Sequence, residues 1–150
     1  MKGYARTRVF DATTLAMLAD AERAVAAIPD SLGEVRCHEV ARAVAGYLFH
    51  RKHIGRALMA VDGTYGSPGG LRHEHSWIEV WPSGSPRGPL FIIDPYAVGR
   101  LPQVQLVDAD PLHGLASMYR EGHERADIDR ALAARMLAAI DEALTKERVS

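Results

Sequence analysis

Cysteine is nearly absent from this chain. Cys37 is the only one among 150 residues, which excludes an intrachain disulfide and fits a reducing compartment. No apolar run reaches the length of a membrane span, and Asp11 and Asp20 interrupt the N-terminal region where a cleaved signal would need one. The 18 basic and 19 acidic residues nearly balance, so the net charge favours neither nucleic acid nor anionic membranes as partners. We expect a cytoplasmic protein without either partner. Signal-independent secretion stays open, as does the oligomeric state.

The pattern of apolar residues predicts one domain, residues 1–150, in the α+β class. Helical spacing favours helices over residues 11–28, capped by Asp11 or Thr13, over residues 34–49, and from about residue 127, with Ile128, Leu132, Met136, Ile140 and Leu144 on one face. Strands are predicted over residues 56–61, 72–81 and 90–93, joined by turn-forming segments that suit antiparallel neighbours. The expected architecture is N-terminal helices, a small antiparallel sheet, and a C-terminal helix packed against that sheet. Residues 62–70 are expected as a flexible loop, and residues 108–127 as a surface loop or a flap.

Three residues in these elements have the side chains of an acyl-transfer triad. Cys37 lies near the start of the second helix, His75 in the middle of a strand, and Asp94 at the end of the next strand. A carboxylate directly after three core residues is unfavourable unless it is paired, and an Asp bonded to the imidazole would fix its tautomer. We expect the two strands to place His75 and Asp94 side by side.

The thiol of Cys37 needs such a partner to become a nucleophile. Lowering a thiol pKa from about 8.5 to about 6 requires roughly 3.4 kcal/mol of thiolate stabilisation. A helix N-terminus supplies about 0.3–1 kcal/mol, and up to about 2 kcal/mol when partly buried. A neighbouring imidazolium is the natural source of the remainder.

The segments around these residues resemble the motifs of the transglutaminase-like superfamily. They read Gly-Glu-Val-Arg-Cys-His-Glu-Val-Ala over 33–41, His-Ser-Trp-Ile-Glu-Val over 75–80 and Ile-Asp-Pro-Tyr over 93–96. The separations of 38 residues from Cys37 to His75 and 19 from His75 to Asp94 are also similar to those of the family. His38 stands where many members have an apolar or small residue.

The resemblance implies a transglutaminase-like, papain-like core and a cysteine enzyme that acts on an amide or acyl carbonyl. Cys37 would be the nucleophile, His75 the general base and acid, and Asp94 the orienting group, with a thioester intermediate and no metal or organic cofactor. Peptidases, protein deamidases, transglutaminases and acyltransferases belong to such families, so the substrate would be a protein, a peptide or a small acyl donor. Trp77, Tyr96 and His73 are the candidate substrate-binding residues.

Three other interpretations of these residues stay open. Cys37 could be an inert, buried small side chain. His73 and His75 lie two apart on one strand face and, with Cys37 or Asp94, could hold a metal ion. The chain could also be a non-catalytic interaction domain whose partner groove is lined by aromatic residues, namely Tyr47, Trp81, Tyr96 and Tyr119.

Overall fold

The computed structural model describes residues 10–32, 36–51, 56–67, 69–82, 88–96, 104–110 and 114–149. Within these segments lie the helices α1 (Ala12–Ala26), α2 (Cys37–Arg51) and α3 (Arg130–Val149), and the short 3-10 helices η1 (Asp30–Leu32) and η2 (Ala116–Met118). The strands are β1 (Arg56–Gly66), β2 (Arg72–Pro82), β3 (Phe91–Asp94), β4 (Gln105–Asp108) and β5 (Tyr119–Glu121). They form one antiparallel sheet in the order β4-β3-β2-β1-β5. The predicted α+β class with an antiparallel sheet is confirmed.

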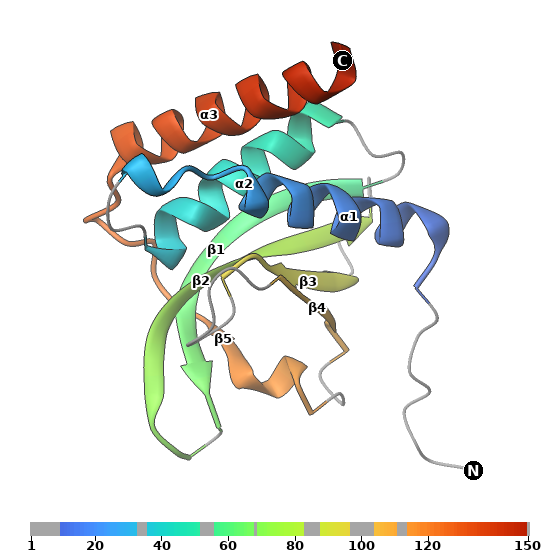
Figure 1. Cartoon of the computed structure of the whole chain (residues 1–150). Coiled ribbons are helices and arrows are strands. Elements are labelled where there is room, and N and C mark those ends of the chain that lie inside the picture. The colour runs from blue at the N-terminus through green and yellow to red at the C-terminus, as the bar shows by residue number, and fades with distance from the viewer. Residues whose placement is uncertain are drawn as a thin grey trace.

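The helices form a layer on one side of the sheet (Figure 1). α2 packs on β1 and β2, and both α1 and α3 pack against α2. Four of the five residues predicted for the apolar face of the last helix are buried, namely Leu132, Met136, Ile140 and Leu144, whereas Ile128 precedes α3 and is half-buried. Its expected packing against the sheet is wrong, because α3 packs mainly on α2 and α1. Gly46 permits this approach, since a Cβ there would lie 2.9 Å from Leu137 Cδ2.

The sheet separates two apolar clusters. Ile78 and Val80 of β2 point into the larger cluster, which the helices cover. Trp77 points to the opposite face, where it joins Val61, Ile92, Val107 and Ala116. All six residues from His75 to Val80 are therefore buried, because both faces of β2 are covered there. The alternation predicted for residues 72–81 is confirmed.

The first strand is longer than its sequence suggests. Asp62 and Gly63 were expected to open a flexible loop, but β1 continues to Gly66 and pairs with β2 over its whole length. The long-range ladder with β2 outweighs the weak strand preference of Asp and Gly. Gly63 has a second function, because a Cβ there would lie 2.1 Å from the carbonyl oxygen of Arg120 in β5. Only glycine lets β5 approach so closely.

The boundaries of the helices lie closer to those predicted from the sequence. Asp11 caps α1, accepting hydrogen bonds from the backbone N of Thr14 at 2.8 Å and its hydroxyl at 2.7 Å. Helix α3 begins at Arg130, three residues after the expected start. Within residues 108–127, positions 116–121 form η2 and β5, so this part is not the surface loop that was expected, whereas residues 122–124 are irregular and exposed as expected. Positions 33–35, which include the expected start of the second helix, and 83–87 lie outside the described residues. No helix in the described segments combines the length and apolar character needed to cross a membrane.

Candidate active site

Cys37 is the first residue of α2, where the helix meets β2. Its side chain is half-buried. The first N–H groups of a helix lack intrahelical partners, and their partial positive charge favours an anion such as a thiolate. Glu39 lies in the same turn, fully buried, but the guanidinium of Arg36 neutralises it through hydrogen bonds of 2.7 and 3.0 Å. The start of α2 therefore remains a favourable place for a negative sulfur atom.

His75 and Asp94 form a buried pair on the face of the sheet opposite the helices. His75 Nε2 lies 2.7 Å from Asp94 Oδ2, and the two residues are 2% and 0% exposed. Asp94 Oδ1 accepts a hydrogen bond from the backbone N of Tyr96 at 3.1 Å, and Oδ2 accepts a second one from the hydroxyl of Tyr119 at 2.8 Å. As every contact of this carboxylate comes from a donor, the proton of the pair is assigned to Nε2. This leaves Nδ1 as the ring nitrogen available for the thiol.

The pKa of His75 is consistent with such an arrangement. Burial lowers it, but the hydrogen bond to Asp94, the hydrogen bond to Cys37 and the charges of both partners raise it from 6.5 to about 9. A rise of that size corresponds to about 3 kcal/mol in favour of the imidazolium. His75 is therefore charged at neutral pH, which is the state that stabilises a thiolate.

Three aromatic rings surround His75. The ring centroids of Tyr65, Trp77 and Tyr119 lie 5.8, 6.2 and 6.4 Å from that of the imidazole. Tyr119 contacts both other rings, at 5.0 and 5.2 Å. Burial and the charge of Asp94 raise the pKa of the Tyr119 hydroxyl, so it stays a hydrogen-bond donor to that carboxylate. The rings fix the imidazole plane and keep water from the His75–Asp94 bond.

Tyr119 is the residue of this site that the sequence did not indicate. It lies in the segment expected to be a loop, and no local pattern marks it as part of the site. Its position depends on β5, which pairs Tyr119 with Tyr65 and Glu121 with Gly63. Gly63 lets β5 pair closely with β1, and β5 in turn places the Tyr119 hydroxyl on Asp94.

The three candidate substrate-binding residues have different surroundings. Trp77 is 1% exposed and is packed in the second apolar cluster, so it supports His75 and presents no surface to a ligand. His73 is exposed on β2. Tyr96 is half-buried, and its backbone N bonds Asp94. Of the three, His73 and Tyr96 retain exposed surface, and the side chain of Tyr96 packs against the larger apolar cluster.

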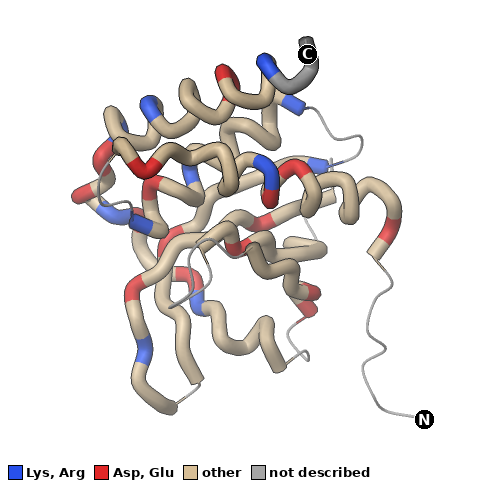
Figure 2. The backbone as a smooth tube through the Cα atoms, in the orientation of Figure 1, with Lys and Arg blue, Asp and Glu red and all other residues tan. Residues whose placement is uncertain are grey.

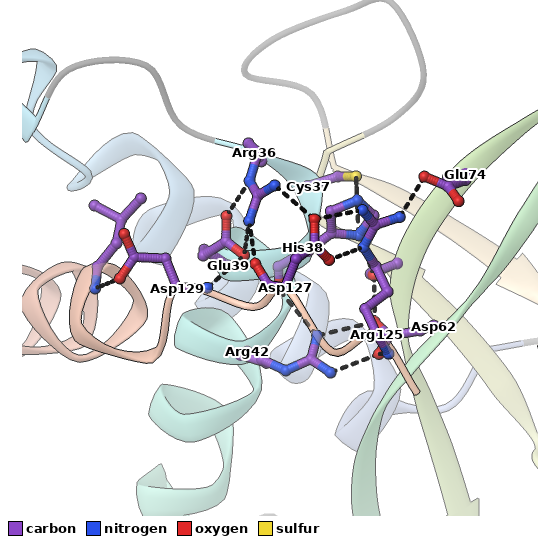
Figure 3. Close-up of polar contacts among 12 residues, drawn as sticks. Arg36, Cys37, His38, Glu39, Arg42, Asp62, Glu74, Arg125, Asp127 and Asp129 are labelled. Atoms are coloured by element: carbon purple, nitrogen blue, oxygen red, sulfur yellow. Dashed lines mark hydrogen bonds and ion pairs between the residues drawn. The ribbon is translucent and has the colours of Figure 1, made fainter. Parts of the chain in front are cut away.

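A second polar network lies on the helix-facing side of β2 (Figure 3). His38 Nδ1 contacts Ser76 Oγ at 2.6 Å, and that hydroxyl donates to Asp62 Oδ1 at 2.5 Å. Arg42 donates to both oxygens of Asp62, at 2.9 and 2.7 Å. Although burial opposes it, Arg42, Ser76 and the backbone N of Arg125 hold the pKa of Asp62 far below its usual range. This carboxylate is therefore ionised.

Positions of both charges lie along the backbone at the side of the molecule where α2 begins (Figure 2), and an ion-pair cluster joins the start of α2, β2 and the segment that precedes α3 (Figure 3). We define it as Arg36, Glu74, Arg125 and Asp127. Asp127 accepts hydrogen bonds from Arg36 at 3.3 Å and from Arg125 at 2.9 and 2.8 Å, and Arg125 also contacts Glu74 at 2.5 Å. Glu74 and Asp127 are largely exposed, so each pair contributes little to stability. The cluster fixes the segment before α3 beside Cys37.

The geometry does not favour the metal site or the aromatic partner groove that the sequence left open. Among the residues that the structure describes, no group of three His, Cys, Asp or Glu side chains could hold a metal ion. Tyr47 is buried in the larger cluster and Tyr119 lies against His75 across the sheet, so these residues do not line a common groove. His113, which the sequence placed in the possible flap, lies outside the described residues.

Comparisons of this chain with protein-family models, with curated proteins and with solved structures found no match.

Proposed function

We propose that this chain is a cysteine-dependent acyl-transfer enzyme with a transglutaminase-like core. Cys37 is the nucleophile, His75 the general acid and base, and Asp94 the group that orients His75. The observation that carries the proposal is the buried His75–Asp94 hydrogen bond of 2.7 Å, and the raised pKa of His75, to which Cys37 contributes, supports it.

Two features support catalysis over a purely structural pair. A buried imidazolium is unfavourable unless it has charged partners, and here the pKa of His75 is held at about 9 by Asp94 and Cys37 against the effect of burial. Cys37 itself is half-buried at the first residue of a helix, so the residue keeps part of its surface in solvent. A histidine that is poised to stabilise an accessible thiolate is typical of thiol nucleophiles.

The first half-reaction forms a thioester. The Cys37 thiolate attacks the carbonyl carbon of an amide or acyl donor, and the developing oxyanion is stabilised by N–H groups at the start of α2, with that of Cys37 as the candidate donor. The imidazolium of His75 gives its proton to the leaving amine. Asp94 keeps Nε2 bonded and aligned as the charge on the ring changes.

In the second half-reaction an acceptor attacks the thioester. Water gives hydrolysis of a peptide bond or deamidation of a side-chain amide, and an amine gives transfer. The proposed substrates are a protein, a peptide or a small acyl donor, and no step requires a metal or an organic cofactor.

The test is alkylation of Cys37 by iodoacetamide, followed by intact mass at pH 6. The wild-type protein is expected to react rapidly because its sulfur is a thiolate. His75→Ala should reduce the rate by about 10²-fold, because the imidazolium that stabilises the thiolate is lost. His50→Ala is the matched control, since His50 is exposed in the last turn of the same helix.

Equal alkylation rates for the wild type and His75→Ala at pH 6 would contradict the proposal.

A further inference from the structure

A second imidazole lies beside the nucleophile. The Cys37 sulfur is 3.7 Å from Nδ1 and 3.8 Å from Nε2 of His38, so it is about equally far from the two ring nitrogens. His38 is buried, at 6% exposure, and its ring is held by Ser76. The proposed triad makes no use of this residue.

The hydrogen bonds around Ser76 determine the tautomer of His38. Asp62 is ionised and has no proton to give, so the hydroxyl hydrogen of Ser76 must lie in its 2.5 Å contact with Asp62 Oδ1. The Ser76 oxygen can then only accept from His38 Nδ1, 2.6 Å away. Nδ1 therefore carries a hydrogen. In a neutral ring, this leaves Nε2 with a free electron pair near the sulfur.

Ser76 cannot itself be the nucleophile of this network. It is 0% exposed, and its hydrogen is directed to a carboxylate that three other hydrogen bonds, two from Arg42 and one from the backbone N of Arg125, hold in place. The hydrogen bonds from Arg42 through Asp62 to Ser76 therefore fix the proton position on His38 and do not activate Ser76.

The two imidazoles at the sulfur differ in charge. Burial and the positive charge of Arg125 lower the pKa of His38, although Glu39 and Asp62 oppose this. The opposite shift in His75 keeps that ring charged at the same pH. Two titratable groups whose surroundings push their pKa values apart are suited to separate acid and base roles.

We propose that His38 is a second catalytic base at Cys37, whose Nε2 takes the proton from the acyl acceptor while His75 serves as the partner of the thiolate. The inference rests on the proposed acyl-transfer function and deepens it. A nitrogen 3.8 Å from the sulfur is near enough to form a hydrogen bond of about 2.8 Å with an acceptor that attacks the carbon bound to that sulfur.

The acceptor in this step is water or an amine. The acceptor forms a bond to the carbonyl carbon and gives one proton to His38 Nε2. The carbon–sulfur bond breaks, and its electron pair stays on Cys37 as a thiolate. When His75 has given its proton to the leaving amine in the first half-reaction, the proton on His38 passes to His75 across the thiolate. The enzyme returns to its starting state, with His38 neutral.

The experiment separates the two half-reactions with p-nitrophenyl acetate, an activated acyl donor. The burst of nitrophenolate measures acylation, its steady release measures deacylation, and intact mass detects acetylated Cys37. The key variant is His38→Asn, because the amide N–H of Asn can replace Nδ1–H towards Ser76 but offers no basic nitrogen. His50→Asn is the control, since His50 is exposed about 18 Å further along α2.

In His38→Asn we expect an acylation rate within about twofold of wild type, a deacylation rate lower by about 10²–10³-fold, and accumulation of acetylated Cys37. Hydroxylamine attacks thioesters without a general base, so it should release the acetyl group from Cys37 of this variant. A ratio of deacylation to acylation within tenfold of the wild-type ratio overturns the role of His38. So does accumulation of an adduct that hydroxylamine cannot release. If wild-type Cys37 is never acetylated, the triad proposal itself fails.

Ser76→Ala provides a second variant if His38→Asn does not fold. It removes the acceptor for Nδ1–H and frees the His38 ring to move its proton to Nε2, where it cannot act as a base. Deacylation should again slow more than acylation, by at least about tenfold. An unchanged ratio of the two rates in Ser76→Ala overturns the inference.

Discussion

Replacing Asp94 with Asn tests the site most directly, because it removes a charge while keeping the shape of the side chain. Asp94 makes the largest of the contributions that raise the pKa of His75 to about 9. In Asp94→Asn this charge is lost but the burial that lowers the pKa remains. We therefore expect the pKa of His75 to fall by about two units or more, although the bond to Cys37 still opposes the effect of burial.

The assay is an NMR titration of the imidazole Cε1–H signals, with the His75 signal assigned from the spectrum of His75→Gln. Wild-type His75 should titrate near pH 9 and the Asp94→Asn variant at least two units lower. Cys37→Ala should lower the pKa by less, since the bond to Cys37 contributes less than that to Asp94. Asp141→Asn, at an exposed position of α3, controls for the change in net charge.

The same shift predicts how stability depends on pH. A group whose pKa is raised on folding stabilises the native state fully below its unfolded value, 6.5 for His75, and this stabilisation is lost as pH rises through about 9. The free energy of unfolding of the wild type should therefore fall by up to about 3 kcal/mol over this window, relative to Asp94→Asn, in urea titrations. A His75 pKa that stays near 9 in Asp94→Asn would refute the reasoning, as would parallel stability curves for the two proteins.

The remaining predictions concern the support of Asp94. Tyr119→Phe removes one donor to Asp94 Oδ2, which should strengthen the pull of that oxygen on the imidazolium. The His75 pKa should rise in the same NMR titration, and stability should fall by about 1–3 kcal/mol; a lower pKa would contradict this role. Gly63→Ala places a Cβ 2.1 Å from the carbonyl oxygen of Arg120, so β5 must move and stability should fall by about 1–3 kcal/mol or more in urea unfolding. An Ala variant as stable as the wild type would show that β5 is free to shift.

Local patterns in the sequence were sufficient for the main elements. Helical spacing predicted α1 and α2 to within a few residues of their bounds, and alternation predicted the two faces of β2. Such patterns succeed because each depends on neighbours within about one helical turn or along one strand. Cys37, His75 and Asp94 could be chosen from these patterns and from motif resemblance. Their roles in catalysis stay a proposal.

The features that the sequence did not reveal all depend on contacts between distant segments. β1 passes through Asp62 and Gly63 because it pairs with β2, against the local preference for a turn. β5 is a strand of three residues, too short to show a period, and exists because β1 offers it an edge.

The sequence by itself determined which side chains with reactive chemistry are present and on which helix or strand each lies. Tertiary structure decided their partners. Tyr119 became a donor to Asp94 only through β5, and His38 gained a fixed tautomer only through Ser76 and Asp62 of the sheet. The physical reason is that a hydrogen bond acts over about 3 Å, so partners 25 or 38 residues apart along the chain are set by packing and not by local pattern.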